Sequence, residues 1–175
     1  MKKIFLAFFT VFCLAAPSRA APLPGADSDL PVDITADSME YDSDKNIVMF
    51  RGQVEAIRGE FKMWSDILTL ILKDKSGQEE KTADMGKNAA GDIDRVIAEK
   101  NVRFRNGTQH GTAQKATFFA RKNILVLEGD PVIQDGENSI RGNVIRYFIN
   151  ENRSVVEGSP KKRVHAVFSN EKKGK

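Results

Sequence analysis

The chain has very few of the residues from which most catalytic and metal-binding sites are built. Its 175 residues include a single cysteine, Cys13, and two histidines, His110 and His165. One thiol forms no internal disulfide, and neither histidine has a second histidine, a cysteine pair or a glutamate at metal-ligand spacing. A glycine-rich phosphate loop and a Gly-x-Ser-x-Gly elbow are also missing. We therefore expect no catalytic residues, no metal and no cofactor, which favours a protein that is not an enzyme.

Long apolar runs are absent except at the start of the chain. After two lysines, an apolar run covers residues 4–16, which is too short for a stable membrane span. Small residues follow at Ser18 and Ala20, the spacing that signal peptidase requires. Residues 1–20 are therefore predicted to be a cleaved secretory signal, which directs the chain to the periplasm. A lipoprotein signal using Cys13 is the alternative, but the bulky residue before this cysteine counts against it.

An excess of charge of one sign is missing from the mature chain. The sequence has 27 Lys and Arg against 24 Asp and Glu. Three of the basic residues and none of the acidic ones lie in the leader, so 27 − 3 = 24 basic residues remain against 24 acidic ones. This balance argues against binding to nucleic acid. Residues 161–175 nevertheless carry a net charge of +5. They are either a solvated chain end or a contact for an acidic partner or lipid phosphates.

Helical periodicity is likewise missing. No stretch keeps a 3.6-residue apolar period over three turns, whereas short runs rich in Val, Ile, Phe and Thr recur between Gly, Asn and Asp. This pattern predicts a domain of β-strands over residues 31–168. A flexible linker at 21–30 would precede it, and a disordered basic tail at 169–175 would follow it.

The strand region contains an internal repeat, found in residues 36–54, 113–131 and 142–160. An aromatic residue, an asparagine and a glycine keep register in these copies: Tyr41, Phe118 and Tyr147; Asn46, Asn123 and Asn152; Gly52, Gly129 and Gly158. The repeat length is 29 residues (142 − 113 = 29), and a fourth copy begins 29 residues after the first, at Ser65. A polar insertion at 73–92 interrupts this copy, which also has Lys100 in place of the glycine. Each unit is predicted to be strand, turn at the asparagine, strand, and corner at the glycine.

Alternation within the copies indicates which side chains point inward. In the first strand of each copy, apolar and polar residues alternate as in a half-buried strand. In the second strand two adjacent columns are both apolar, so this strand is either covered on both sides or close to a mouth. Because one unit cannot bury its apolar face alone, the units must stack. The prediction is an all-β fold, a twisted β-jellyroll or solenoid of stacked antiparallel strands with open edge strands at both ends.

The first and last strands of the domain have no polar cap. Exposed strand edges are templates for pairing with another chain, so head-to-tail addition of identical or related sheets is expected. The residues predicted to make these edge contacts are Val32 and Ile34 at one end and Val164, Ala166 and Phe168 at the other.

Three segments carry a resemblance to a known family: PVDITADSMEYD (31–42), IDRVIAEKNVRF (93–104) and IQDGENSIRGNVIRYF (133–148). In these segments the chain resembles the OstA-like family of periplasmic lipopolysaccharide transport proteins. The resemblance implies a β-jellyroll that binds lipopolysaccharide, with lipid A acyl chains in an apolar groove and the sugars outside. It also implies partners in a bridge between the membranes, namely inner-membrane LptC-like and outer-membrane LptD-like OstA domains, joined by a head-to-tail homo-oligomer.

The groove lining that this resemblance implies is taken from the inward columns of the repeat. The candidates are Met39, Tyr41, Met49, Leu68, Leu70, Phe118, Val126, Ile145, Tyr147 and Val155. A packed interior has the same composition as a lipid groove, so each of these side chains could instead fill the core. Two other functions stay open at this point: a structural β-solenoid filament of the envelope with a solid core and no lipid ligand, and an enzyme acting on envelope polymers.

Overall fold

The computed structural model describes residues 31–73, 93–151 and 153–169. The predicted leader and linker, almost all of the insertion, and the tail beyond Ser169 lie outside these residues. Within the described ranges, no helix has the length and apolar character needed to cross a membrane.

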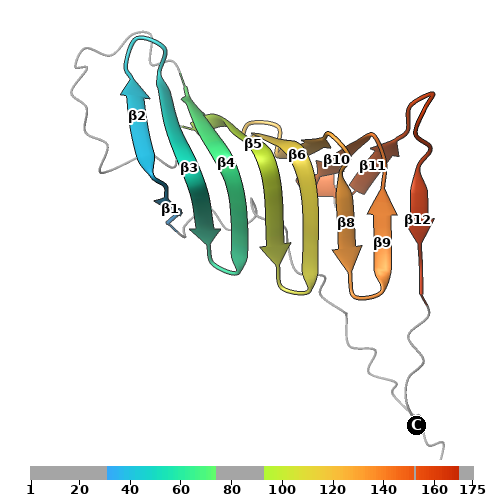
Figure 1. Ribbon diagram of the computed structural model, residues 1–175. Coiled ribbons are helices and arrows are strands. Elements are labelled where there is room, and N and C mark those ends of the chain that lie inside the picture. Colours follow the sequence, from blue (N-terminus) through green and yellow to red (C-terminus); the bar gives the residue numbers. More distant parts are fainter. Residues whose placement is uncertain (1–30, 74–92, 152, 170–175) are drawn as a thin grey trace, which may run out of the picture.

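The described residues form one antiparallel sheet of twelve strands (Figure 1), which confirms the all-β prediction. A single 3₁₀ turn, η1 (Ile149–Glu151), interrupts the strands. The strands are β1 (Asp33–Thr35), β2 (Ser38–Asp42), β3 (Ile47–Arg58), β4 (Phe61–Leu72), β5 (Ile93–Asn106), β6 (Gln109–Phe119), β7 (Ile124–Glu128), β8 (Val132–Asp135), β9 (Asn138–Arg141), β10 (Val144–Phe148), β11 (Arg153–Glu157) and β12 (His165–Val167).

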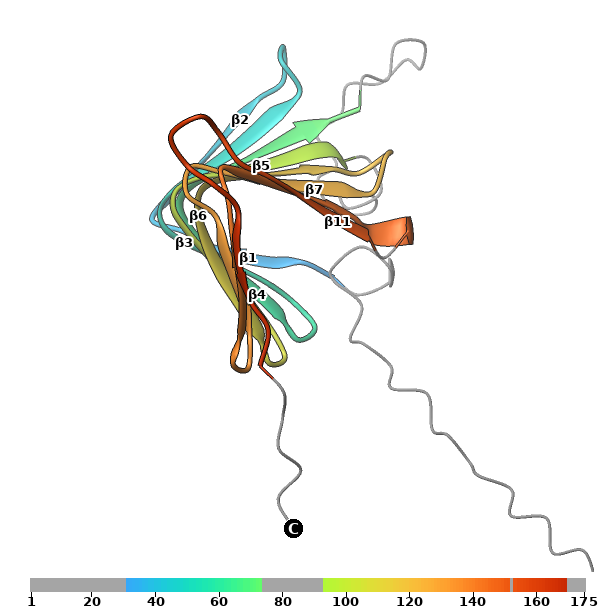
Figure 2. The same ribbon diagram turned by 90° about the vertical axis from the view of Figure 1, so that its right-hand side faces the viewer.

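The sheet bends into two walls that diverge from a common corner, as Figure 2 shows. Strands β3 to β6 run through both walls. The upper wall continues with β2 at one end and with β7, β10 and β11 at the other. The lower wall continues with β1 at one end and with β8, β9 and β12 at the other. The sheet therefore ends in open strands on both sides, as the sequence predicts.

Pairs of residues with left-handed backbone conformation make the corner. They are Gly52–Gln53 (φ 80° and 43°), Lys100–Asn101 (φ 64° and 53°) and Gly129–Asp130 (φ 72° and 62°). The strand register breaks at the first two pairs, which is how a bulge bends a sheet. Lys100 thus has the same left-handed backbone conformation as the glycines of the other copies. This conformation costs free energy for a residue that has a Cβ. Gly158, the third glycine of the repeat, does not have a left-handed φ.

Tight turns connect the strands at the outer ends of the walls. Asn46 and Asn123 have φ of 52° and 53°, which confirms both as reversal points, whereas Asn152 lies outside the described residues. In the turn before Asn46, the Lys45 Nζ donates a hydrogen bond to Asp42 Oδ2 at 2.6 Å. Backbone amides of the same turn also donate to this carboxylate. These interactions hold the pKa of Asp42 below its usual value, with the lysine contact as the largest cause.

The hydrophobic core fills the corner between the two walls. Leu68, Leu127 and Ile145 of the upper wall are each 1% exposed, and so are Val54 and Val102 of the lower wall. Burying a side chain of this size contributes roughly 1.5–3 kcal/mol. The corner is therefore packed, and accessible apolar surface is found only farther out along the walls.

Candidate functional site

A continuous apolar row crosses the upper wall on the face turned toward the lower wall. Residues that pair directly in an antiparallel sheet lie on the same face, so the strand register defines this inner row. Its members, in order from β2 to β10, are Tyr41, Val48, Leu70, Val96, Phe118, Leu125 and Tyr147. Every strand contributes one apolar or aromatic side chain and no charged group.

Val48 in the inner row is buried, at 5% exposed, and the other members are only partly covered. Leu70, Val96 and Leu125 pack against the core on one side and keep part of their surface exposed. Tyr41, at the β2 end, is 37% exposed. Apolar surface in an unbroken line is costly to leave in water, so this row is where an apolar ligand gains most from binding.

A second inner row lies one step closer to the corner and is packed. It contains Leu68 and Ile145, both predicted as groove lining and both 1% exposed. These two side chains therefore fill the packed core, which was the alternative to lining a groove. Met39 ends the same row on β2, where it opposes Phe50 and is 51% exposed.

Three of the ten predicted lining residues lie on the other face of the sheet, so their prediction as inward-facing residues is wrong. Met49 directly opposes Glu40 and Thr69, which places it on the outer face. Val126 and Val155 both oppose Arg146. The physical reason is that these strands are apolar on both faces, so that alternation alone does not decide which face is inner.

Sequence reasoning missed three members of the inner row, namely Val48, Val96 and Leu125. The positions of the turns could have identified them, because a short turn fixes which residues pair across two strands. Because β2 and β3 are joined by a short turn at Asn46, counting outward from it pairs Tyr41 with Val48. The same count from the turn at Asn123 pairs Phe118 with Leu125.

The lower wall has its own apolar row facing the inner row. It runs through Ile34, Ala56, Met63, Phe104, Gly111, Ile133, Ile140 and Ala166. A Cβ at Gly111 would lie 2.4 Å from the ring of Phe104, so the ring occupies the space above this glycine. The two predicted edge residues Ile34 and Ala166 are the ends of this row.

The strands at the ends of the lower wall leave apolar side chains in solvent. Val32 precedes β1 and is 38% exposed, whereas Val164 and Phe168 flank β12 with 46% and 77% exposed. Within the described residues, β1 pairs only with β3, and β12 pairs only with β9. Each end therefore offers both free backbone edge and apolar side chains to another strand.

Tyr147 is the member of the inner row on β10, and it is partly buried. Its partial burial raises the pKa of the phenol above the ordinary value of about 10, because a phenolate loses hydration there. The phenol of Tyr147 thus lies in an environment less polar than water.

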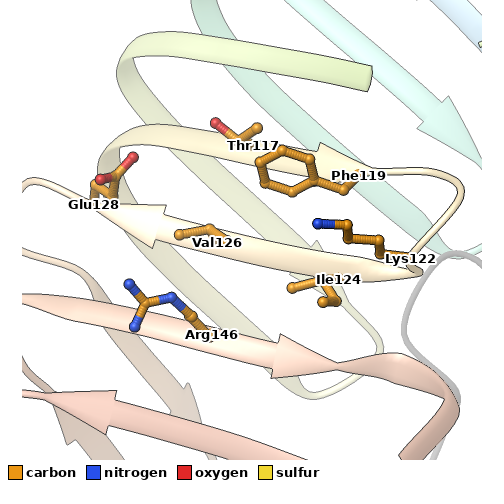
Figure 3. Close-up of a pocket in the computed structure, with 7 residues that line it drawn as sticks. All are labelled: Thr117, Phe119, Lys122, Ile124, Val126, Glu128 and Arg146. Atoms are coloured by element: carbon orange, nitrogen blue, oxygen red, sulfur yellow. The ribbon is translucent and has the colours of Figure 1, made fainter. Parts of the chain in front are cut away.

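The outer face of the upper wall carries a shallow pocket of about 330 Å³ (Figure 3), and Val126 is part of it. Two ring contacts flank the region, with the Arg95 guanidinium 4.9 Å from the centre of Phe119 and the Arg153 guanidinium 4.0 Å from that of Phe148. The pocket is lined by Thr117, Phe119, Lys122, Ile124, Val126, Glu128 and Arg146. Its charges are partly compensated, since Arg146 forms an ion pair with a glutamate outside the pocket.

No metal centre accompanies these surfaces in the part of the chain that the structure describes, where no three His, Cys, Asp or Glu side chains gather. His110 on β6 and His165 on β12 both lie exposed on the lower wall.

The chain is similar to curated and solved proteins along most of its length. It is 25% identical over 159 residues to the lipopolysaccharide export system protein LptA of Escherichia coli (strain K12), covering 89% of this chain and 82% of the relative. It is 28% identical over 163 residues to the export system protein LptH of Pseudomonas aeruginosa, covering 89% and 88%. The crystal structure of LptH from Pseudomonas aeruginosa matches with a TM-score of 0.65 at 19% identity. That match covers 82% of this chain and 99% of the other.

A family description matches the domain itself. Residues 33–153 match the family described as LptA/(LptD N-terminal domain) LPS transport protein. The match begins with β1 and extends to the first residue of β11, so it contains the whole inner row. The chain therefore belongs to the LptA/LptD N-terminal domain family of lipopolysaccharide transport proteins.

Proposed function

We propose that this protein carries lipopolysaccharide through the periplasm, with lipid A acyl chains lying against the inner row. The observation that supports this most directly is the unbroken, partly exposed apolar line from Tyr41 to Tyr147, with one residue from each of seven strands. The relatives named as lipopolysaccharide export proteins support the same ligand. The predicted leader at residues 1–20 supports the periplasmic location.

The chemistry of the inner row suits a carrier that must also release its ligand. Each acyl CH₂ buried there contributes about 0.8 kcal/mol without needing a particular polar partner. Neighbouring strands are about 4.8 Å apart, so seven strands extend the row over roughly 29 Å. A chain held by non-directional contacts can move along such a row in small steps, whereas ion pairs or hydrogen bonds would hold it at one point.

The open edges support the second part of the proposal, a head-to-tail bridge. A strand added beside β12 or β1 would extend the apolar row of the lower wall past Ala166 or Ile34. Backbone pairing of this kind joins sheets of related fold. We propose that a second copy and the OstA-like domains of an LptC-like and an LptD-like partner add at these edges, so that the inner face continues from one chain to the next.

The experiment that tests lipid binding uses two neighbouring residues on β6. Phe118 pairs with Leu125 on the inner face, and Phe119 pairs with Ile124 on the outer face. A photoreactive phenylalanine at position 118 is expected to crosslink to lipopolysaccharide, whereas the same group at 119 serves as the matched control. Equal crosslinking at both positions, or none at 118, contradicts the proposal. Stable head-to-tail oligomers that never take up lipopolysaccharide would instead favour a purely structural filament.

A further inference from the structure

The outer face of the lower wall is cationic. Lys62 on β4, Arg103 and Arg105 on β5, and Arg141 on β9 are all exposed. The register places them on the face opposite to Met63, Phe104 and Ile140, which point inward. We call the outer side of the lower wall from β4 to β12 the cationic face.

On this face one pair of like charges, Lys62 and Arg105, stands directly opposed, and two histidines, formally neutral at pH 7, stand opposite arginines. Lys62 pairs with Arg105, and Arg105 pairs with His110 on the next strand. At the far end, His165 of β12 pairs with Arg141. Directly opposed cations destabilise a sheet, so folding does not explain this arrangement. An anion bound across the strands would remove the repulsion.

The two walls differ in how their cations are compensated. On the upper wall Arg51, Arg121 and Arg153 each form an ion pair, with Glu40, Asp94 and Glu151 respectively. Among the described residues, the four Lys and Arg side chains of the cationic face form no such pair. Arg105 reaches only the carbonyl oxygen of Gly107, at 3.4 Å. On the strands of this wall's outer side the acidic residues are Asp33 on β1 and Glu55 on β3, beyond the cationic face, and Glu60 and Glu137 lie in the turns at its rim.

The side chains between the cations indicate the kind of partner. They include Thr112, Gln134 and Ser139, which are polar, and the half-buried Trp64 and Val132, which directly oppose Arg103 and Arg141. Protein interfaces have aromatic or apolar centres that are depleted of charge, whereas here Trp64 and Val132 each stand directly beside an arginine. A face whose charged side chains are all cations, spread over two dimensions, is complementary to an array of phosphate headgroups.

We propose that the cationic face binds the surface of a membrane containing anionic phospholipids. This contact lies on the opposite side of the sheet from the inner row, so it does not compete with an acyl ligand and does not depend on the function proposed above. It would hold the protein reversibly at the membrane surface and confine its search for a partner to two dimensions.

The test is sedimentation of the mature protein with vesicles of phosphatidylglycerol and phosphatidylcholine, compared with vesicles of phosphatidylcholine alone. Binding is expected only to the anionic vesicles and is expected to weaken in high salt. Each Lys or Arg near an anionic surface is worth about a factor of five. The double variant Arg103→Gln/Arg105→Gln should therefore bind roughly 30-fold more weakly.

The matched control is Arg51→Gln/Arg121→Gln, which removes the same charge from two ion-paired positions on the upper wall. Its affinity for the vesicles is expected to change less than about threefold, because those charges are already compensated. An equal loss in both variants would mean that only net charge matters and would overturn the assignment to this face. Retention on purified peptidoglycan but not on anionic vesicles would overturn the phospholipid partner. Failure to bind lipopolysaccharide would count against the proposed function alone.

Discussion

Lys100 and Gly52 occupy equivalent places at the corner of the sheet, with φ of 64° and 80°. Each is followed by a second residue with left-handed backbone. A Cβ at Gly52 would lie 2.1 Å from Oδ2 of Asp37, so glycine is required there. The side chain of Lys100 is exposed, and the remaining cost at this position is that of its backbone conformation.

The first prediction is that Lys100→Gly does not destabilise the protein. Relief of the left-handed cost, about 1–2 kcal/mol, is opposed by the larger entropy of glycine in the unfolded chain, about 0.5–1 kcal/mol. The free energy of unfolding in urea should therefore stay equal or rise by up to about 1.5 kcal/mol. The control is Lys62→Gly in the extended part of β4, where only the loss of about 0.5–1 kcal/mol applies. Equal destabilisation by both substitutions would contradict a strained corner.

The second prediction separates backbone strain from crowding at glycine. Gly129 and Gly136 both have left-handed φ, 72° and 57°. A Cβ at Gly129 would lie 2.5 Å from the Cβ of Gln114, whereas nothing lies within 4 Å of one at Gly136. Both alanine variants lose about 1–2 kcal/mol from the backbone, and Gly129→Ala should lose at least about 1 kcal/mol more. Urea unfolding of the two variants measures this difference, and equal losses would show that the corner yields to a methyl group.

Features that depend on local backbone chemistry could be predicted from the sequence. These are the all-β class, the turns at Asn46 and Asn123, and the corner at Gly52. Asparagine and glycine mark positive φ wherever they recur at fixed spacing. Even Lys100, which breaks the glycine pattern, keeps the corner because its neighbouring strands impose the same bend on both sides.

The division between inner and outer face could be predicted only in part. Alternation placed Tyr41, Phe118 and Tyr147 on one face with the core, since polar neighbours separate the columns there. It failed at Met49 and Val126, where both faces are apolar and only pairing across the turn decides. The exposed fraction of each side chain could not be predicted either. Whether Leu68 is packed or accessible depends on the opposite wall, which is distant in sequence.

The third prediction concerns the phenol of Tyr147. Its pKa is raised by burial, so above pH ~10 the unfolded chain loses this proton before the folded chain does, and stability falls as pH rises. The chain has two tyrosines, so in Tyr41→Phe the tyrosinate absorbance reports Tyr147 alone. We expect a midpoint above 10, and a further rise when lipopolysaccharide is bound, because acyl chains remove more water. No change on adding lipopolysaccharide would place the lipid away from the inner row.

The fourth prediction tests the open edge at β12. Phe168 follows β12 and is 77% exposed, whereas Val167 opposes Ser139 on the outer side and is 42% exposed. Burial of a phenylalanine in a joint between copies contributes roughly 1.5–3 kcal/mol, so Phe168→Ser should weaken self-association about tenfold or more. Val167→Ser, at the adjacent last residue of β12, is the control and should change the association by less. Sedimentation equilibrium across protein concentrations measures both association constants.

Because neither side chain belongs to the core, the monomer should unfold at an unchanged urea concentration, which separates a lost joint from a damaged fold. Equal association constants for the wild type and Phe168→Ser would exclude this edge as the joint.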